Sequence, residues 1–362
     1  MEIQQRNFGL SHNQLAAAMM ANREQCALVE GEMGSGKSDL LKMLAKLLPN
    51  HIACYFDSTT KDVGDILIPK FKSDGEVDYF TSATNEELGM HLDKPLILML
   101  DEYEKANPSV KNALLRLILE GKIGSRELHP ESIRFATSNL GEEGLGDALM
   151  PHQENRVTRF RLRKPTNIEW ADWGQNNGVN YIVSAWALEN EKLFQSFEGI
   201  RPEDNPYIYH PDRQQRGFVT PRSLVAASNW MNVASEIDSA TLEASLVGTI
   251  GGIGGSELFN YSKLISELPT LDSIKTSPAT ALVPTGASAI IMVVYRTLQN
   301  IEREWVDAWL EYLARLPTSA MAYFLNGIKA KDHPRQAIVM NNINFQKLAH
   351  ENAHMFAADK RG

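Results

Sequence analysis

Short, mostly apolar runs alternate with amphipathic stretches over the first 164 residues of the chain. The runs lack the polar alternation of half-exposed strands, which predicts strands buried on both faces, as in a parallel sheet. We expect such strands at 26–29, 51–56, 95–100 and 133–139. Apolar residues three and four apart predict amphipathic helices at 13–20, 40–48 and 110–118. Together these elements predict an α/β fold.

Smaller elements fill the segments between these runs. The pattern predicts a short strand at 77–80, a helix at 85–91 and a hairpin at 121–130. From Arg159 the period is two, with Arg159, Arg161 and Arg163 on one face and apolar residues on the other. Because charged side chains protect an exposed sheet edge from further pairing, we interpret this stretch as a half-exposed edge strand.

The pattern becomes helical after Lys164-Pro165. We expect helices at 167–173, 179–188, 192–197, 288–301, 304–316, 319–328 and 343–355. Thr220 and Pro221 open another helix as N-cap and first-turn residue. The glycine-rich segment 248–255 follows no strand, so a helix break is favoured over a dinucleotide site, and 266–287 has the prolines of a linker.

Composition places the chain among ordinary globular proteins. It has 362 residues, 43% hydrophobic and 22% charged, which is enough for two or three domains. The net charge of −9 argues against a nucleic-acid binder that uses its whole surface. Cys26 and Cys54 lie in apolar runs and are expected to be buried free thiols. No apolar stretch resembles a signal peptide or a membrane span, so we expect a cytoplasmic protein.

One segment carries an explicit chemical signature. Residues 31–38 match the P-loop pattern, between a predicted strand and a predicted helix. The matched residues are Gly31, Glu32, Met33, Gly34, Ser35, Gly36, Lys37 and Ser38. Glycines allow successive backbone N–H groups to converge on a phosphate, and the helix that follows points its positive end at the same charge. Lys37 is expected to reach the β- and γ-phosphates of ATP, and the Ser38 hydroxyl to bind Mg²⁺.

Two carboxylates end the apolar run at 95–100. Asp101 lies 64 positions after Lys37, and Glu102 follows it, at the carboxyl end of a predicted buried strand. In parallel α/β sheets this edge binds the ligand. We expect Asp101 to hold Mg²⁺ through water, and Glu102 to act as the base that polarises the attacking water.

Three further polar residues are candidates for the same site. Asn139 ends another predicted strand and could hydrogen-bond the γ-phosphate or the attacking water. Arg156 precedes the alternating stretch and is a candidate functional arginine, with Arg159 as the alternative. Arg222 lies in the first turn of a helix, where a cation is unfavourable, which suggests that it is retained to bind a phosphate.

Residues 62–68 allow two interpretations. A polar segment here presents Ile66, Leu67 and Ile68 before a proline. They could form a short helix packed on the sheet, or a loop that contacts a substrate.

These motifs, in this order and at this spacing, resemble those of an AAA+ ATPase of the MoxR branch, in versions common in phage and bacterial genomes. Gly31–Ser38 is similar to Walker A, Leu96–Glu102 to Walker B, Asn139 to sensor 1, Arg156 to an arginine finger and Arg222 to sensor 2. The segment 101–108, with the helix and hairpin that follow, resembles the corresponding part of MoxR proteins. The resemblance covers about residues 1–260.

The resemblance implies a three-layer core with a five-stranded parallel sheet. The sensor 1 strand would lie between the strands of Walker A and Walker B. It also implies a nucleotide-binding domain at 1–164, an α-helical lid at 165–260 and a helical C-terminal extension at 261–362. The nucleotide-binding segment would extend to Asp39.

The resemblance further implies a homo-oligomeric ring, a hexamer in this class, with Arg156 acting on the neighbour's γ-phosphate. Residues 62–68 fall where such rings carry a pore loop, and aliphatic residues there favour local remodelling over processive threading. The first hypothesis is an ATP- and Mg²⁺-dependent, chaperone-like ATPase that remodels a protein partner, such as one with a von Willebrand factor A domain.

Two alternatives remain. A nucleic-acid motor or loader in phage replication or packaging is motivated by Lys122, Arg126 and Arg134 around the hairpin. A nucleotide-dependent assembly platform without catalysis is the third reading.

Overall fold

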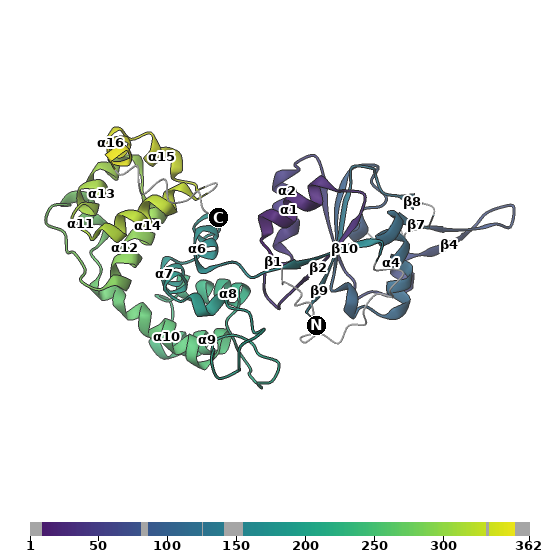
Figure 1. Ribbon diagram of the computed structural model, residues 1–362, viewed down its shortest axis with the longest axis horizontal. Coiled ribbons are helices and arrows are strands. Elements are labelled where there is room, and N and C mark those ends of the chain that lie inside the picture. The colour runs from purple at the N-terminus through teal and green to yellow at the C-terminus, as the bar shows by residue number, and fades with distance from the viewer. Residues whose placement is uncertain (1–8, 81–85, 125, 141–154, 331–332, 352–362) are drawn as a thin grey trace, which may run out of the picture. The chain divides into compact units, whose positions relative to one another are not determined.

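A computed structural model of the chain describes residues 9–80, 86–124, 126–140, 155–330 and 333–351 (Figure 1). The chain divides into two compact units, Met1–Lys164 and Pro165–Gly362. We refer to them as the nucleotide-binding unit and the helical unit. The division falls where the hydrophobic pattern changes from mixed to purely helical.

A six-stranded parallel sheet forms the centre of the nucleotide-binding unit. Its strand order is β1-β10-β2-β9-β6-β3. The strands are β1 (Gly9–Leu10), β2 (Cys26–Gly31), β3 (Ile52–Asp57), β6 (Leu96–Asp101), β9 (Ile133–Asn139) and β10 (Val157–Leu162). The α/β class is therefore confirmed, and so is the predicted position of the strand that ends at Asn139, β9, between β2 and β6.

Two sequence predictions about the sheet were wrong. The sheet has six strands and not five, because the two-residue strand β1 adds to the outer side of β10. For the same reason β10 is not an edge strand, although its arginines alternate with apolar residues. The positive charge of Arg159 is balanced by ion pairs with Glu30 and Glu104 of the same unit, and its side chain is not simply solvated.

The sheet is covered on both faces, which makes three layers. Alternate residues of β6 enter two different cores, because successive side chains of a strand point to opposite faces. Leu96, Leu98 and Leu100 pack with α4 (Pro108–Glu120), and Ile97 and Met99 pack with α1 (His12–Ala21) and α2 (Asp39–Leu47). All five strand residues are at most 1% exposed. This double burial explains the continuous apolar run in the sequence.

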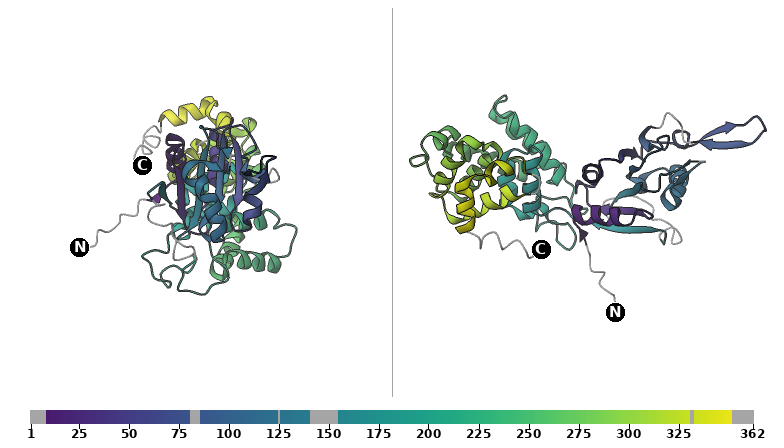
Figure 2. Two further views of the ribbon diagram at one scale, coloured as in Figure 1. Left: turned by 90° about the vertical axis from the view of Figure 1, so that its right-hand side faces the viewer. Right: turned by 90° about the horizontal axis from the view of Figure 1, so that it is seen from above.

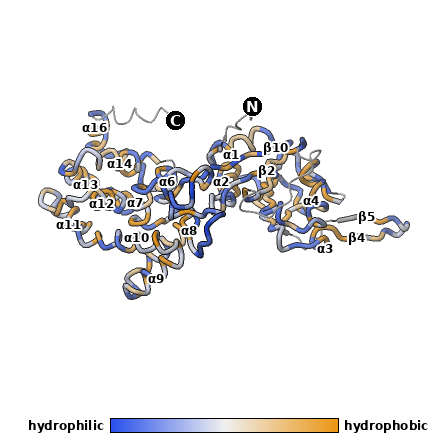
Figure 3. Tube along the Cα trace, turned by 60° about the horizontal axis from the view of Figure 1, so that its bottom comes forward, coloured by the Kyte–Doolittle hydropathy of each residue, from blue (hydrophilic) through white to orange (hydrophobic). Residues whose placement is uncertain are grey.

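Smaller elements complete this unit. They are α3 (Val63–Ile66), β4 (Ile68–Phe71), β5 (Val77–Phe80), η1 (Glu86–Leu88), η2 (Tyr103–Lys105), β7 (Lys122–Ile123) and β8 (Arg126–Glu127). The predicted hairpin at 121–130 is confirmed by the antiparallel pair β7–β8. The helix expected at 85–91 is only one short 3₁₀ turn in the described residues. A second hairpin, β4–β5, extends away from the rest of the unit (Figures 1 and 3).

The helical unit is built around one continuous core. Its helices are α6 (Asn167–Asn176), α7 (Tyr181–Glu189), η3 (Glu191–Phe194), α8 (Pro221–Asn232), α9 (Ser239–Ile250), α10 (Gly252–Ser262), η4 (Lys263–Glu267), α11 (Leu271–Thr276), α12 (Ala287–Asn300), η5 (Arg303–Trp305), α13 (Val306–Leu313), α14 (Thr318–Lys329), α15 (Gln336–Met340) and α16 (Ile343–Glu351). Figure 2 gives two further views of them.

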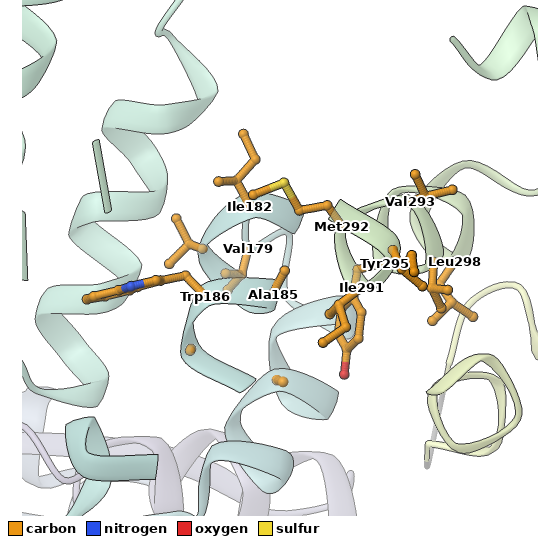
Figure 4. Close-up of a cluster of buried hydrophobic side chains, with 14 of the residues drawn as sticks. Val179, Ile182, Ala185, Trp186, Ile291, Met292, Val293, Tyr295 and Leu298 are labelled. Atoms are coloured by element: carbon orange, nitrogen blue, oxygen red, sulfur yellow. The ribbon is translucent and has the colours of Figure 1, made fainter. Parts of the chain in front are cut away.

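The contact between α7 and α12 shows how this core is made. Ile182 and Trp186 of α7 belong to the same buried cluster as Met292 and Tyr295 of α12, and the side chains of Ile182 and Met292 lie toward each other between the two helices (Figure 4). The core continues without a break across residue 260. The core gives no boundary between the lid predicted at 165–260 and the extension predicted at 261–362. This division stays a prediction.

Several local expectations are also met. Thr220 caps α8 and forms a capping box with Ser223. The glycine-rich segment breaks a helix at Gly251, between α9 and α10. Cys26 and Cys54 are buried free thiols. None of the helices in the described ranges has the length and apolar character needed to cross a bilayer.

Candidate nucleotide-binding site

The P-loop lies between the end of β2 at Gly31 and the start of α2 at Asp39. Gly34 and Gly36 have φ angles of 68° and 92°, a region that L-residues with a side chain rarely adopt. A Cβ atom on Gly36 would also lie 2.8 Å from Nε2 of His12. The turn therefore depends on glycine at this position, and it has the alternating geometry that gathers backbone N–H groups around an anion.

Lys37 lies within this loop. Its Nζ donates to the carbonyl oxygens of Gly31 at 2.7 Å and of Glu32 at 3.0 Å. It also donates to Oδ1 of Asn139 at 2.8 Å, across 102 positions of sequence. Asn139 is placed there because the last residues of β2 and β9, Gly31 and Asn139, are partners in the parallel register. The structure thus brings the Walker A lysine and the predicted sensor 1 residue into direct contact.

Asp101 ends the next strand, β6, and is held by two hydroxyl groups. Tyr55 of β3 donates to Oδ2 at 2.9 Å, and Thr137 of β9 donates to Oδ1. Desolvation, and then the hydrogen bond to Asp101, raise the pKa of Tyr55 far above its ordinary value. Tyr55 is therefore a stable donor at neutral pH, and the orientation of Asp101 is fixed from both sides.

Glu102 has a left-handed backbone, with φ of 49°, and it is the single non-glycine residue with positive φ in the described part of the chain. Its N–H donates to Oγ1 of Thr137 at 3.2 Å, so one hydroxyl orders both carboxylate residues. Its Oε1 pairs with Nζ of Lys105 at 3.1 Å. Such backbone strain costs of order 1–3 kcal/mol and is typical of functional positions.

The residues present fit a magnesium nucleotide. Ser38 occupies the N-cap position of α2, yet its side chain makes no capping hydrogen bond, which leaves the hydroxyl for a ligand. The Asp101 oxygens each accept one of the hydrogen bonds above and keep lone pairs for metal-bound water. The Ser35 hydroxyl is buried and has no hydrogen-bond partner among the described residues.

No cluster of three or more His, Cys, Asp or Glu side chains suited to a metal occurs in the described residues. A Mg²⁺ ion would not need such a cluster, because it keeps several waters and binds through one or two protein oxygens plus phosphates. Ser38 and Asp101 would hold the ion, which neutralises phosphate charge when bound.

The two candidate arginines differ in their surroundings. Arg156 is exposed in the turn before β10. Arg159 forms an ion pair with Glu30 of β2, and its Nη1 lies 3.8 Å from Oε1 of Glu104. Arg159 is therefore committed to contacts within its own unit, whereas Arg156 faces solvent.

Arg222 is the exposed second residue of α8 in the helical unit. Its proposed part in phosphate binding stays a prediction. Asp39 begins α2 and pairs with Lys42 at 2.9 Å.

Sequence reasoning missed three residues of the site, Thr137, Tyr55 and His12. Thr137 lies two residues before Asn139, and that spacing is a usable signal because alternate residues of a strand share a face. Tyr55 and His12 had no such signal, since their partners lie on other elements. His12 Nε2 lies 3.1 Å from the carbonyl oxygen of Gly36.

The residues around the β7–β8 hairpin that suggested nucleic-acid binding make internal contacts. Arg134 is buried and donates to the carbonyl oxygens of Ile118 and Glu24. Arg126 donates to the carbonyl of Met90, and Lys122 pairs with Glu127. Arg134 is therefore a structural residue and not part of a basic surface, whereas Arg126 is exposed and Lys122 is partly exposed.

Comparisons with known proteins agree with this geometry. Residues 27–137 match the AAA domain of the dynein-related subfamily. The matched segment lies within the nucleotide-binding unit and is similar to an AAA domain, and the fold of this unit is that of an AAA+ P-loop NTPase.

A curated relative, the ATP-dependent protease ATP-binding subunit-like protein of Rhodococcus erythropolis, is 27% identical over 143 residues. The match covers 38% of this chain and 38% of the relative, so this chain spans about two fifths of the relative's length. Among solved structures, a single-substitution mutant of RuvB from Thermotoga maritima is 16% identical with a TM-score of 0.36. That alignment covers 70% of this chain and 73% of the RuvB chain.

Proposed function

We propose that the chain is an ATPase of MoxR type that binds ATP with Mg²⁺ at the P-loop edge of the sheet. The carrying observation is the contact between Lys37 Nζ and Asn139 Oδ1, with Asp101 and Glu102 ordered beside it by Thr137. The site keeps the lysine, both strand-end carboxylates and the strand-end amide that hydrolysis would need. Their presence favours an ATPase over a nucleotide-dependent assembly platform without catalysis. Lys37 would bind the β- and γ-phosphates, and Glu102 would polarise the attacking water.

The active form in this proposal is a homo-oligomeric ring, a hexamer by analogy with the class. Arg156 would act on the γ-phosphate bound by a neighbouring subunit, and Arg222 would contact a phosphate as sensor 2. The exposure of Arg156 and the internal ion pairs of Arg159 support Arg156 as the finger. An arginine finger accelerates hydrolysis by about 10³–10⁵ in GTPases.

The proposed work of the ring is to remodel a protein partner. The support is the β4–β5 hairpin, where Ile68, Phe71 and Val77 are 44%, 76% and 44% exposed. In the segment before it, Val63–Ile66 form the short helix α3, and Ile66 is buried in the core with α4, as the first interpretation of 62–68 expects. Contact of this segment with a substrate stays a prediction. Phe71 is an exposed aromatic residue that the sequence analysis did not single out. A partner with a von Willebrand factor A domain is one candidate.

The experiment that tests this proposal is a substrate trap. Glu102→Gln is held in ATP and Mg²⁺, purified from its native cell, and the molecules that accompany it are identified. A recurrent protein that is released by ADP supports remodelling. Nuclease-sensitive nucleic acid in its place would favour a motor or loader, and salt-sensitive DNA binding would then be required.

A further inference from the structure

A buried ion pair joins the P-loop to the end of β10. Lys164 Nζ lies 2.5 Å from Oε2 of Glu32, and the two side chains are only 5% and 8% exposed. Exposed ion pairs contribute little to stability, but removing one partner of a buried pair leaves a charge without compensation in a low-dielectric environment. This pair therefore constrains both segments strongly.

Glu32 is the second residue of the P-loop, and its backbone is part of the lysine site. Its carbonyl oxygen accepts a hydrogen bond from Lys37 Nζ at 3.0 Å. The preceding Gly31 also approaches β10 closely, because a Cβ atom there would lie 3.1 Å from the carbonyl oxygen of Leu162. The start of the P-loop is thus fixed against the end of β10 by backbone packing and by charge.

Lys164 is well placed to act as a fixed point. It is the last residue of the nucleotide-binding unit. It precedes Pro165, and a residue before proline is restricted to extended backbone conformations. Arg163 Nη1 donates to its carbonyl oxygen at 3.0 Å. A glycine-rich loop has many alternative conformations, so an anchor of this kind reduces the entropy that phosphate binding must otherwise remove.

We propose that Lys164 is a positioning residue for the phosphates of ATP, which acts through Glu32 to hold the first turn of the P-loop ready for the nucleotide. This inference rests on the proposed function for the identity of the ligand. Lys164 does not touch the ligand in this account. Its effect is on affinity and on loop order, and not on the chemical step.

The test is a double-mutant cycle with Glu32→Gln, Lys164→Met and the double variant. The matched control is the exposed pair Arg116–Glu120 on α4, at 3.0 Å, replaced in the same way. Affinity for a fluorescent ATP analogue and turnover at saturating ATP are measured for each protein. Amide hydrogen exchange of residues 31–38 is measured in the nucleotide-free proteins.

We expect each single change to weaken ATP binding about tenfold, and the double variant to bind no worse than either single variant, because all three lose the same pair. Turnover of Lys164→Met at saturating ATP should change by less than about twofold, since Lys164 makes no contact with the nucleotide. Exchange in the P-loop should become faster. Lys164→Arg should retain affinity, and the control pair should have no effect.

Wild-type affinity and wild-type P-loop exchange in Lys164→Met would overturn the inference, and so would additive losses in the double variant. If Lys164→Met does not fold, Glu32→Gln carries the test, because it keeps the size and hydrogen-bonding capacity of the side chain. A wild-type protein that does not bind ATP contradicts the proposed function instead. In that case hydrogen exchange still decides whether the pair orders the loop.

Discussion

Lys37 Nζ donates a 2.8 Å hydrogen bond to Oδ1 of Asn139, and this contact joins the P-loop, which follows β2, to the end of β9. In this structure the lysine satisfies its charge with Asn139 and with the carbonyls of Gly31 and Glu32. A bound phosphate offers the same donor a full negative charge. Charge-assisted hydrogen bonds are about twice as strong as neutral ones, so phosphate binding is expected to reorganise this network.

Lys37→Ala is expected to weaken ATP binding by about 100-fold or more, because it removes the ammonium group that faces the phosphates. Isothermal titration with ATP in Mg²⁺ measures the change. Lys46→Ala, at an exposed position in the last turn of α2, is the matched control and should bind normally. ATP binding by Lys37→Ala at wild-type affinity would remove the basis for the site.

Glu102→Gln is expected to bind ATP as the wild type does and to lose hydrolysis by at least about 100-fold, because an amide is a poor general base. Binding and phosphate release are measured on the same preparation. Glu127→Gln, on the exposed strand β8, is the control. Unchanged turnover in Glu102→Gln would show that another group polarises the water.

Thr137→Val is expected to reduce turnover about 10- to 100-fold while ATP affinity changes little. The change deletes the hydroxyl that donates to Asp101 and accepts from the N–H of Glu102, and hydrogen bonds to charged groups contribute about 1.5–3 kcal/mol. Thr137→Ser keeps that hydroxyl and should recover most of the activity. Equal loss in both variants would point to packing and not to the hydroxyl.

Arg156→Ala is expected to bind ATP and to hydrolyse it at least about 10³-fold more slowly. Mixing it with Lys37→Ala should restore part of the activity, since each subunit then supplies what the other lacks. Arg159→Ala should instead lower the melting temperature, because it leaves Glu30 without its partner. Full activity in Arg156→Ala, with loss of activity in a stably folded Arg159→Ala, would reverse the assignment.

His333 makes the stability of the helical unit depend on pH. Its Nδ1 accepts from the N–H of Arg335 at 3.1 Å, so Nε2 carries the proton and donates to Oε1 of Gln175 at 3.1 Å. Burial, and then the charge of Arg335, lower the pKa of His333 to about 4. In the unfolded chain the pKa of His333 has its ordinary value near 6.5. Between pH 4 and pH 6.5 the unfolded chain therefore binds more protons than the folded one.

Because the unfolded state binds the extra proton, this group makes the free energy of unfolding fall as the pH falls from about 6.5 to 4. We expect a loss of about 2 kcal/mol over that window from His333 alone. Urea unfolding at several pH values measures it. His333→Gln should lose less stability on acidification than the wild type, because glutamine does not titrate in this pH window. If the free energy of unfolding falls equally with pH in the wild type and in His333→Gln, His333 is not the source of the pH dependence.

Much of the nucleotide-binding unit was determined by local sequence. Glycines at 34 and 36 are required by backbone angles that few other residues tolerate, and the apolar run at 96–100 reflects burial on both faces. The strand-end positions of Asp101 and Asn139 followed from the same pattern. These signals are local because they depend on backbone geometry and on the period of a strand.

Tertiary structure alone decided which strands are neighbours and which charges meet. The short strand β1 covers β10, and this made the edge-strand prediction wrong although the alternation was read correctly. Arg134, expected near a basic surface, is buried because carbonyls from two other segments accept its hydrogen bonds. The Glu32–Lys164 pair and the contact of the Tyr55 hydroxyl with Asp101 likewise gave no signal in the sequence. Their partners are far apart in the chain, and only the parallel register brings them within hydrogen-bonding distance.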